Sequence, residues 1–247
     1  MNHYIISDIH GYANLLYDLV ETLKKTIQKE DTIVFLGDYI NRGTNSKGVV
    51  DIVLQLKNEY NVVCLKGNHE QWMLQSFQEG NNSWIMGMDG FSTVASYSPE
   101  FADELRAVFK KLGPKIFLQK DIIIPYYQTF FKEIMPQQHL NFFLNLKGYY
   151  ESEGLLCVHA GINQDRPLEE QQEQDLLWSL PQDLLHTWRG EQTIVMGHQG
   201  THEVYKSMWG KPIITEKVIL LDTSCYNTGV LSAIRFPDRE VFQAALS

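Results

Sequence analysis

Short apolar runs and amphipathic stretches alternate along the first seventy residues. The runs at 4–7, 32–37 and 61–67 are rich in Ile, Val, Leu and Phe, and each leads directly into polar residues. Runs of this kind are typical of strands buried on both faces. Two helical faces lie between them, formed by Leu15, Leu16, Leu19, Val20 and Leu23 and by Val49, Val50, Ile52, Val53, Leu54 and Leu56. This alternation predicts a βαβαβ unit with parallel strands.

The pattern changes after the third run. Residues 71–150 have helical periodicity and glycine-rich patches, which predicts a helical insertion or cap. Its aromatic residues are expected mostly in the core, among them Trp72, Trp84, Phe91, Tyr97, Tyr126, Tyr127, Phe130 and Phe131. From residue 154 onward the apolar runs return at closer spacing, which favours antiparallel pairing for 217–224 and 230–236. With no repeat or clear linker, we expect a single domain over residues 1–247.

The composition indicates a soluble globular protein, and its net charge bears on the kind of partner that it binds. The 247 residues are 44% hydrophobic and 21% charged, as in ordinary soluble globular proteins. The formal net charge of −9 argues against a duplex nucleic acid partner, which usually selects a basic face. It does not exclude an anionic substrate, because bound divalent cations can reverse the local potential.

Three cysteines, Cys64, Cys157 and Cys225, lie scattered in apolar runs. Their odd number and spacing indicate buried reduced thiols and no disulfide framework. No stretch reaches the roughly 18 apolar residues of a membrane span, and the N-terminus lacks the features of a signal peptide. We therefore expect a cytoplasmic enzyme with no membrane partner.

The polar clusters after five of the apolar runs all contain residues that bind metals. The residues are Asp8, His10, Asp38, Asn68, His69, His159 and His198. Loops at the carboxyl ends of parallel strands gather at one edge of a sheet, so these side chains are expected to converge. A set of Asp, His and Asn without Cys suits Mn²⁺, Fe²⁺ or Zn²⁺. Six of these residues as ligands already exceed the needs of one ion, and two ions about 3.5–4 Å apart fit the number.

Five ordered motifs make the chain resemble a known family. DIHG (8–11), GDYINRG (37–43), GNHE (67–70), HAGI (159–162) and GH (197–198) resemble the calcineurin-like metallophosphoesterases, and most closely bacterial phosphatases of the phosphoprotein phosphatase type. Segments 165–178 and 221–229 also resemble sequences of that family. The resemblance implies an α/β fold in which two packed, mainly mixed β-sheets form a sandwich flanked by helices, with a helical insertion.

The resemblance also implies two groups of metal ligands that share one carboxylate. The first group is Asp8, His10 and Asp38, and the second is Asp38, Asn68, His159 and His198. Manganese is the first candidate for both ions, with iron, zinc, nickel and cobalt left open. The ions would supply a hydroxide near neutral pH for attack on phosphorus.

Four residues are implied to act on the substrate. His69 would donate a proton to the leaving oxygen, and Arg42 would bind phosphate through two hydrogen bonds. Asn68 would also contact the phosphate. Lys66 stands where relatives often carry arginine and would supply a point charge.

The chain departs from the family pattern at two places. Asn41 replaces an aspartate that pairs with the catalytic histidine in the protein phosphatases. An amide can orient the imidazole ring but cannot stabilise its cation, so we expect slow turnover of poor leaving groups. Ser179 and Leu180 stand where close relatives read Ile-Arg, so a phosphate clamp is either absent or supplied by Arg166 or Arg189.

These features leave three functional hypotheses. The first is a phosphomonoesterase acting on phosphoproteins at Ser, Thr or Tyr. The second is a symmetrical dinucleoside tetraphosphate hydrolase, which Asn41 and Leu180 both favour. The third is a weakly active regulatory protein that binds phosphorylated partners through its metals. The oligomeric state stays open.

Overall fold

The first sheet grows from the N-terminal βαβαβ unit. The computed structural model describes residues 1–246, and in it strands β1 (His3–Ile6), β2 (Thr32–Phe35) and β3 (Asn61–Cys64) pair in parallel. Helices α1 (Ala13–Leu23) and α2 (Ser46–Glu59) connect them, as the alternating pattern predicts. Strands β9 (Val230–Phe236) and β10 (Glu240–Ala245) complete the sheet antiparallel, in the order β10-β9-β1-β2-β3.

The second sheet has the order β4-β5-β6-β8-β7. Its strands are β4 (Tyr149–Ser152), β5 (Leu155–Val158), β6 (Thr193–Met196), β7 (Ile213–Ile214) and β8 (Val218–Leu220). The central strands β5, β6 and β8 run parallel, and only the edge strands β4 and β7 are antiparallel. The prediction of antiparallel pairing is therefore correct for β9 but wrong for the pairing of β8 with β6.

The reason for this difference lies in the connections. Parallel neighbours need a crossover long enough to return the chain to the same end of the sheet. The links from β5 to β6 and from β6 to β8 contain the short helices α9 (Glu173–Trp178) and α10 (Thr201–Val204). These helices are too short to give a clear periodicity in the sequence.

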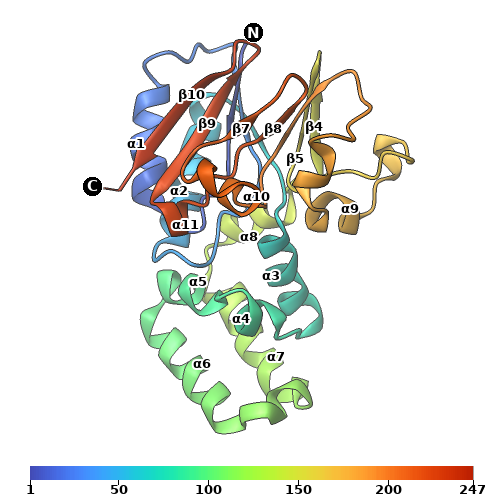
Figure 1. The fold of residues 1–247 in the computed structure, drawn as a ribbon. Coiled ribbons are helices and arrows are strands. Elements are labelled where there is room, and N and C mark those ends of the chain that lie inside the picture. Colours follow the sequence, from blue (N-terminus) through green and yellow to red (C-terminus); the bar gives the residue numbers. More distant parts are fainter. Residues whose placement is uncertain (247) are drawn as a thin grey trace.

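The two sheets pack face to face and enclose an apolar core (Figure 1). Ile5 and Val34 point into this core, whereas their neighbours Tyr4, Ile33 and Phe35 point to the other face of the first sheet and join the core under α1 and α2. This alternation follows from the two-residue period of a strand. It explains why the N-terminal strands are apolar on both faces. The three cysteines are free and buried, as predicted.

Most of the predicted helical segment is helical in the structure. It contains α3 (Asn68–Glu79), α4 (Ser83–Gly87), α5 (Gly90–Tyr97), α6 (Pro99–Leu112), η1 (Gly113–Phe117), α7 (Lys120–Thr129), η2 (Phe130–Ile134) and α8 (Gln137–Leu144). In Figure 1, α6 and α7 project away from the sheets, whereas α3 and α8 lie against their lower edge. Strand β4 begins inside the range predicted as helical.

Short elements complete the chain. They are η3 (Leu168–Glu170), η4 (Pro181–Leu184), η5 (Lys206–Met208) and α11 (Cys225–Thr228). Within residues 1–246, no helix is both long enough and apolar enough to cross a membrane.

The core between the sheets predicts a large difference between two Ile→Ala substitutions. Ile5 is fully buried there, whereas Ile122 on α7 is 43% exposed. Ile5→Ala should lower the free energy of unfolding by about 2–5 kcal/mol because it leaves a cavity. Ile122→Ala should change it by less than about 0.5 kcal/mol. Urea denaturation of both variants measures this, and equal losses would contradict the assignment of the core.

Candidate metal centre

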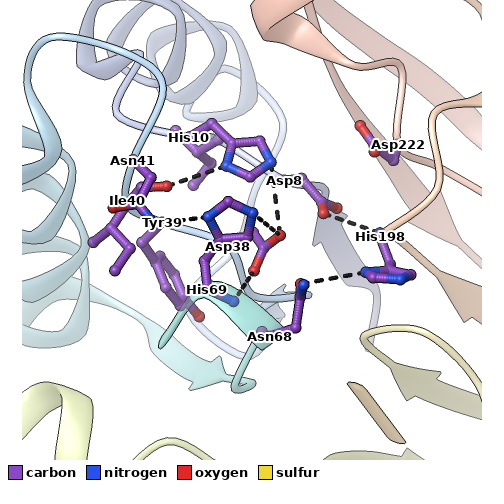
Figure 2. Close-up of polar contacts among 12 residues, drawn as sticks. Asp8, His10, Asp38, Tyr39, Ile40, Asn41, Asn68, His69, His198 and Asp222 are labelled. Atoms are coloured by element: carbon purple, nitrogen blue, oxygen red, sulfur yellow. Dashed lines mark hydrogen bonds and ion pairs between the residues drawn. The ribbon is translucent and has the colours of Figure 1, made fainter. Parts of the chain in front are cut away.

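Five strand ends bring their polar loops to one edge of the sandwich. Strands β1, β2 and β3 of the first sheet and β5 and β6 of the second all end there, and Figure 2 labels side chains that follow β1, β2, β3 and β6. The predicted residues Asp8, His10, Asp38, Asn68, His69 and His159 are buried at this edge, and His198 is half-buried. The structure therefore brings together all seven strand-end residues predicted from the sequence.

The carboxylate of Asp38 lies between two groups of potential ligands. His10, Asp38 and His69 place ligand atoms within 4.8 Å of one another, and so do Asp38, His159 and His198. Nε2 of His10 lies 3.6 Å from Oδ2 of Asp38, and Nε2 of His159 lies 3.7 Å from Oδ1. Because each oxygen faces a different group, Asp38 has the geometry of a carboxylate that bridges two ions.

Two histidines are oriented by backbone carbonyls. Nδ1 of His10 donates to the carbonyl of Ile40 at 3.1 Å, and Nδ1 of His159 donates to that of Leu36 at 3.0 Å. A carbonyl can only accept, so the ring proton lies on Nδ1 and the lone pair on Nε2. In both rings Nε2 faces Asp38. Metal-binding histidines are commonly held in this way, so the donor set fits a metal centre.

Asn68 completes the second group. Its Oδ1 lies 3.0 Å from Nε2 of His159 and 3.3 Å from Nδ1 of His198. An amide oxygen and two ring nitrogens therefore meet within a small volume, beside one oxygen of Asp38. These are the four residues that the family resemblance implies for one ion.

Asp8 is placed differently from the other candidates. Its Oδ1 accepts from Oγ of Ser7 at 3.0 Å, and its Oδ2 accepts from the backbone nitrogen of His198 at 2.9 Å. Among residues 1–246, Asp8 belongs to neither group around Asp38, and His69 stands in the first group instead. The carboxylate nevertheless lies at the same edge, with its hydrogen bond to His198 visible in Figure 2.

The backbone is strained at several of these residues. His10, Asp38 and His198 adopt left-handed conformations, with φ of 48°, 52° and 66°. This conformation costs a non-glycine residue roughly 1–2 kcal/mol. Strain of this kind persists where surrounding structure enforces it, and it clusters at functional sites. Here the three residues contribute side chains to the two groups around Asp38.

Glu70 holds the Asp38 loop, a role that the sequence reasoning missed. Its carboxylate accepts from the backbone nitrogens of Asp38 at 2.9 Å, Tyr39 at 2.9 Å and Gly67 at 3.0 Å. The side chain is fully buried, and burial raises its pKa to about 7. The signal was available in GNHE, because a glutamate three residues after a helix N-cap completes a capping box.

The buried carboxylates and neutral histidines of the site would be stabilised by added positive charge. Burial raises the pKa of Asp38 well above its usual range, and the carboxylates of Glu70 and Asp8 raise it further. Burial also lowers the pKa of His159 to about 4 and that of His198 to about 3, so both rings are neutral near pH 7. Buried carboxylates beside neutral imidazoles are the arrangement that divalent cations stabilise.

Of the two predicted phosphate-binding cations, only Arg42 faces the centre. Its guanidinium is exposed and stacks 3.7 Å above the ring of Tyr226, which packs at 5.3 Å against His10. Lys66 instead forms an ion pair with Glu173 at 2.7 Å. A phosphate contact by Lys66 would require that ion pair to open. Tyr226 was not predicted, although it lies in the motif at 221–229.

The two suggested replacements for the missing arginine are engaged elsewhere. Arg166 pairs with Asp175 at 3.1 Å, and Arg189 pairs with Asp165 at 2.7 Å. Leu180, which stands in place of the arginine, is 49% exposed. Among the three arginines, Arg42 therefore stays the candidate for phosphate binding.

The close approach of Gly67 to Asp38 allows a test of Asp38 as a metal ligand that does not remove its side chain. A Cβ at Gly67 would overlap Oδ1 of Asp38 and lie 2.5 Å from the Asp38 backbone nitrogen. Since φ of Gly67 is −99°, alanine is compatible with the backbone there, and the effect is purely steric. We expect Gly67→Ala to weaken Mn²⁺ binding about tenfold or more by displacing Asp38.

Isothermal titration with Mn²⁺ measures this effect. Gly87→Ala is the matched control, because its Cβ would meet only the Trp72 side chain, at 3.2 Å. Unchanged affinity in Gly67→Ala would argue against Asp38 as a ligand.

Comparison with known proteins identifies the family. A family model described as calcineurin-like phosphoesterase matches residues 1–223. Serine/threonine-protein phosphatase 2 of Escherichia coli K12 is 32% identical over 122 residues, which is 49% of this chain and 54% of that protein.

Two further similarities extend over almost the whole chain. The asymmetrical bis(5'-nucleosyl)-tetraphosphatase PrpE of Oceanobacillus iheyensis is 26% identical over 262 residues, 98% of this chain and 91% of that protein. A solved structure of a candidate diadenosine tetraphosphatase shares the fold, with a TM-score of 0.64 at 21% identity, over 99% of this chain and 93% of that one. With the match over residues 1–223, the chain belongs to the calcineurin-like phosphoesterases, a family of enzymes that depend on two metal ions, and is a metal-dependent phosphatase of that family.

Proposed function

We propose that the chain hydrolyses phosphate esters at two divalent metal ions held on either side of Asp38. The observation that carries this proposal is the Asp38 carboxylate, whose two oxygens face two separate groups of histidines. One ion would be held by Asp8, His10 and Asp38 and the other by Asp38, Asn68, His159 and His198. Asp8 is placed in the first group on the strength of the family resemblance, and Mn²⁺ is the first candidate for both ions.

Each remaining residue has a defined part in the reaction. When bound, the ions supply a water nucleophile of lowered pKa and offset the charge on the phosphoryl oxygens. Arg42 binds and orients the phosphate from the exposed side, where its stacking on Tyr226 limits its movement. His69 lies beside His10, with its ring centroid 4.7 Å away, and would act on the oxygen that leaves phosphorus.

Phosphomonoesters, with phosphoproteins first, are the first substrate candidate. The similarity to serine/threonine-protein phosphatase 2, which covers 49% of this chain, supports it. An exposed Arg42 at the mouth of the site is compatible with a substrate as large as a protein.

Dinucleoside tetraphosphates are the second candidate. They are supported by the similarity to the asymmetrical tetraphosphatase PrpE, which extends over almost the whole chain. The sequence hypothesis named the symmetrical reaction. The products separate the two reactions, since symmetrical cleavage of diadenosine tetraphosphate gives two ADP and asymmetrical cleavage gives AMP and ATP.

Steady-state hydrolysis tests the proposed function. Metal-stripped protein should be inactive toward p-nitrophenyl phosphate, and Mn²⁺ should restore its turnover. His159→Asn should lower kcat/KM at least about a hundredfold, because the second ion loses a ligand. His186→Asn changes an exposed histidine away from the centre and should match the parent enzyme.

The same assay with a phosphoserine peptide, a phosphotyrosine peptide and diadenosine tetraphosphate ranks the substrate candidates. Two bound ions without turnover of any of these compounds would contradict the enzymatic proposal and leave the phosphate-binding regulatory protein.

A further inference from the structure

Asn41 is held by contacts on both ends of its side-chain amide. It is fully buried, with its backbone in the left-handed region at φ 70°. Its Nδ2 lies 2.7 Å from Nδ1 of His69. Its Oδ1 accepts from Nε1 of Trp84 at 3.0 Å and from Oγ1 of Thr93 at 2.7 Å. Both donors come from the helical segment, on α4 and α5.

The indole of Trp84 fixes which way the amide points. An indole N–H can only donate, so the Asn41 atom that meets it must be the carbonyl oxygen. A flipped amide would set two donors against each other in a dry interior, which is costly. The NH₂ group therefore faces His69 and donates to Nδ1. The His69 proton must then lie on Nε2, which is the ring atom on the Asp38 side, 3.9 Å from Oδ2.

Neither donor can move away easily. Trp84 is fully buried and packs against Phe130 and Phe131, each with ring centroids 6.0 Å away. A Cβ at Gly90 would lie 2.8 Å from the indole, so the glycine makes room for it. These contacts tie the indole to the aromatic core of the helical segment.

Thr93 is tied to the Asn41 loop by further hydrogen bonds. Its hydroxyl donates to Oδ1 of Asn41 and accepts from the Asn41 backbone nitrogen at 2.9 Å. It also lies 3.1 Å from the hydroxyl of Ser46, at the start of α2. Thr93 therefore clamps both the backbone and the side chain of Asn41.

We propose that Trp84 and Thr93 are positioning residues that lock the Asn41 amide, hold His69 as its Nε2–H tautomer, and so direct the enzyme toward substrates with acidic leaving groups. The inference rests on the proposed function, because it concerns the oxygen that departs during that reaction. The helical segment would then influence which substrates the enzyme cleaves, although Trp84 and Thr93 lie apart from the candidate metal ligands along the chain.

The way in which the leaving oxygen departs follows from the number of protons on the His69 ring. The water gives one proton to solvent and its oxygen forms a bond to phosphorus while the bond to the leaving oxygen breaks, and that oxygen takes the electron pair. A neutral ring that donates from Nε2 offers a hydrogen bond but does not give up its proton readily. The oxygen therefore departs as an anion and takes its proton from solvent afterwards. Nucleotide phosphates and phenolates are stable anions, whereas a serine alkoxide is not.

This places the two substrate candidates in order. Phosphoanhydrides such as dinucleoside tetraphosphates release a nucleotide anion and need no proton at the moment of cleavage. Among phosphoproteins, phosphotyrosine releases a phenolate and is favoured over phosphoserine. The fixed orientation of the Asn41 amide therefore favours dinucleoside tetraphosphates over phosphomonoesters and, among the phosphomonoesters, favours aryl esters.

Two variants of the Mn²⁺-loaded enzyme test the positioning role. Trp84→Phe removes the indole N–H, and Thr93→Val removes the hydroxyl. Each should lower kcat for p-nitrophenyl phosphate about tenfold or more, with KM and bound Mn²⁺ within about twofold of the parent, because the ring loses its orientation but the ligands stay. Thr93→Ser should recover most of the rate.

Trp188→Phe is the matched control. Trp188 also donates through its indole, at 2.9 Å to the carbonyl of Gln192, but on a loop away from the centre. Its variant should keep the parent kcat. Parent-like kcat in both Trp84→Phe and Thr93→Val would overturn the inference, and so would a loss of Mn²⁺ in Thr93→Val equal to the loss of rate, since that would show a merely structural role.

The tautomer can be observed directly. In Zn²⁺-loaded protein, ¹⁵N-detected long-range spectra assigned by comparison with His69→Asn should show His69 with a bare Nδ1 and a protonated Nε2. In Thr93→Val the two nitrogen shifts should move toward each other as the amide begins to turn. A His69 ring protonated on Nδ1 in the parent enzyme would overturn the inference that Asn41 holds the Nε2–H tautomer, whatever the measured activity.

The leaving-group preference has its own measurement. Across aryl phosphates of increasing phenol pKa, kcat/KM of the parent should fall steeply, and Asn41→Asp should flatten this dependence, because a carboxylate supports a second ring proton. Turnover with a flat dependence in the parent would sink the inference and leave the proposed function intact. Absence of turnover in every substrate would instead remove the proposed function.

Discussion

The carboxylate of Asp38 must lie between two groups of imidazoles, and much of the local structure serves that placement. Its backbone takes a strained left-handed conformation, and its backbone nitrogen is bound by the buried Glu70. The following helix begins at Asn68, directly after Gly67, the residue whose missing side chain leaves room for the carboxylate. A carboxylate buried so deeply is unfavourable as an isolated anion, and bound divalent cations would stabilise it there.

The sandwich architecture explains how two sheets contribute to one centre. The first sheet supplies Asp38 and the first group of ligands, and the second sheet supplies His159 and His198. Because the two sheets share an apolar core, their strand ends are held at a fixed separation. A packed interior transmits small displacements, so the two groups of ligands behave as one rigid unit.

The helical segment contacts the centre as well as covering the sheets. Trp84 and Thr93 are linked to His69 through the Asn41 amide, and the aromatic core packs against Trp84. Aromatic side chains expected mainly to fill the core therefore also set the orientation of a polar group at the centre. This gives a physical reason for an aromatic cluster so close to a polar site, since it excludes water from the hydrogen bonds that orient His69.

The sequence by itself determined the parallel N-terminal unit and the residues that meet at the strand ends. Both follow from local rules, since apolar runs set the strands and their carboxyl ends gather at one edge. Only the tertiary structure decided the rest: the parallel pairing of β8 with β6, the place of His69 rather than Asp8 beside His10, and the pairing of Lys66 with Glu173. It alone also fixed the direction of the Asn41 amide. These features depend on the lengths of irregular connections and on contacts between residues far apart along the chain, such as Asn41 with Trp84 and Thr93, and no local pattern of residues encodes such contacts.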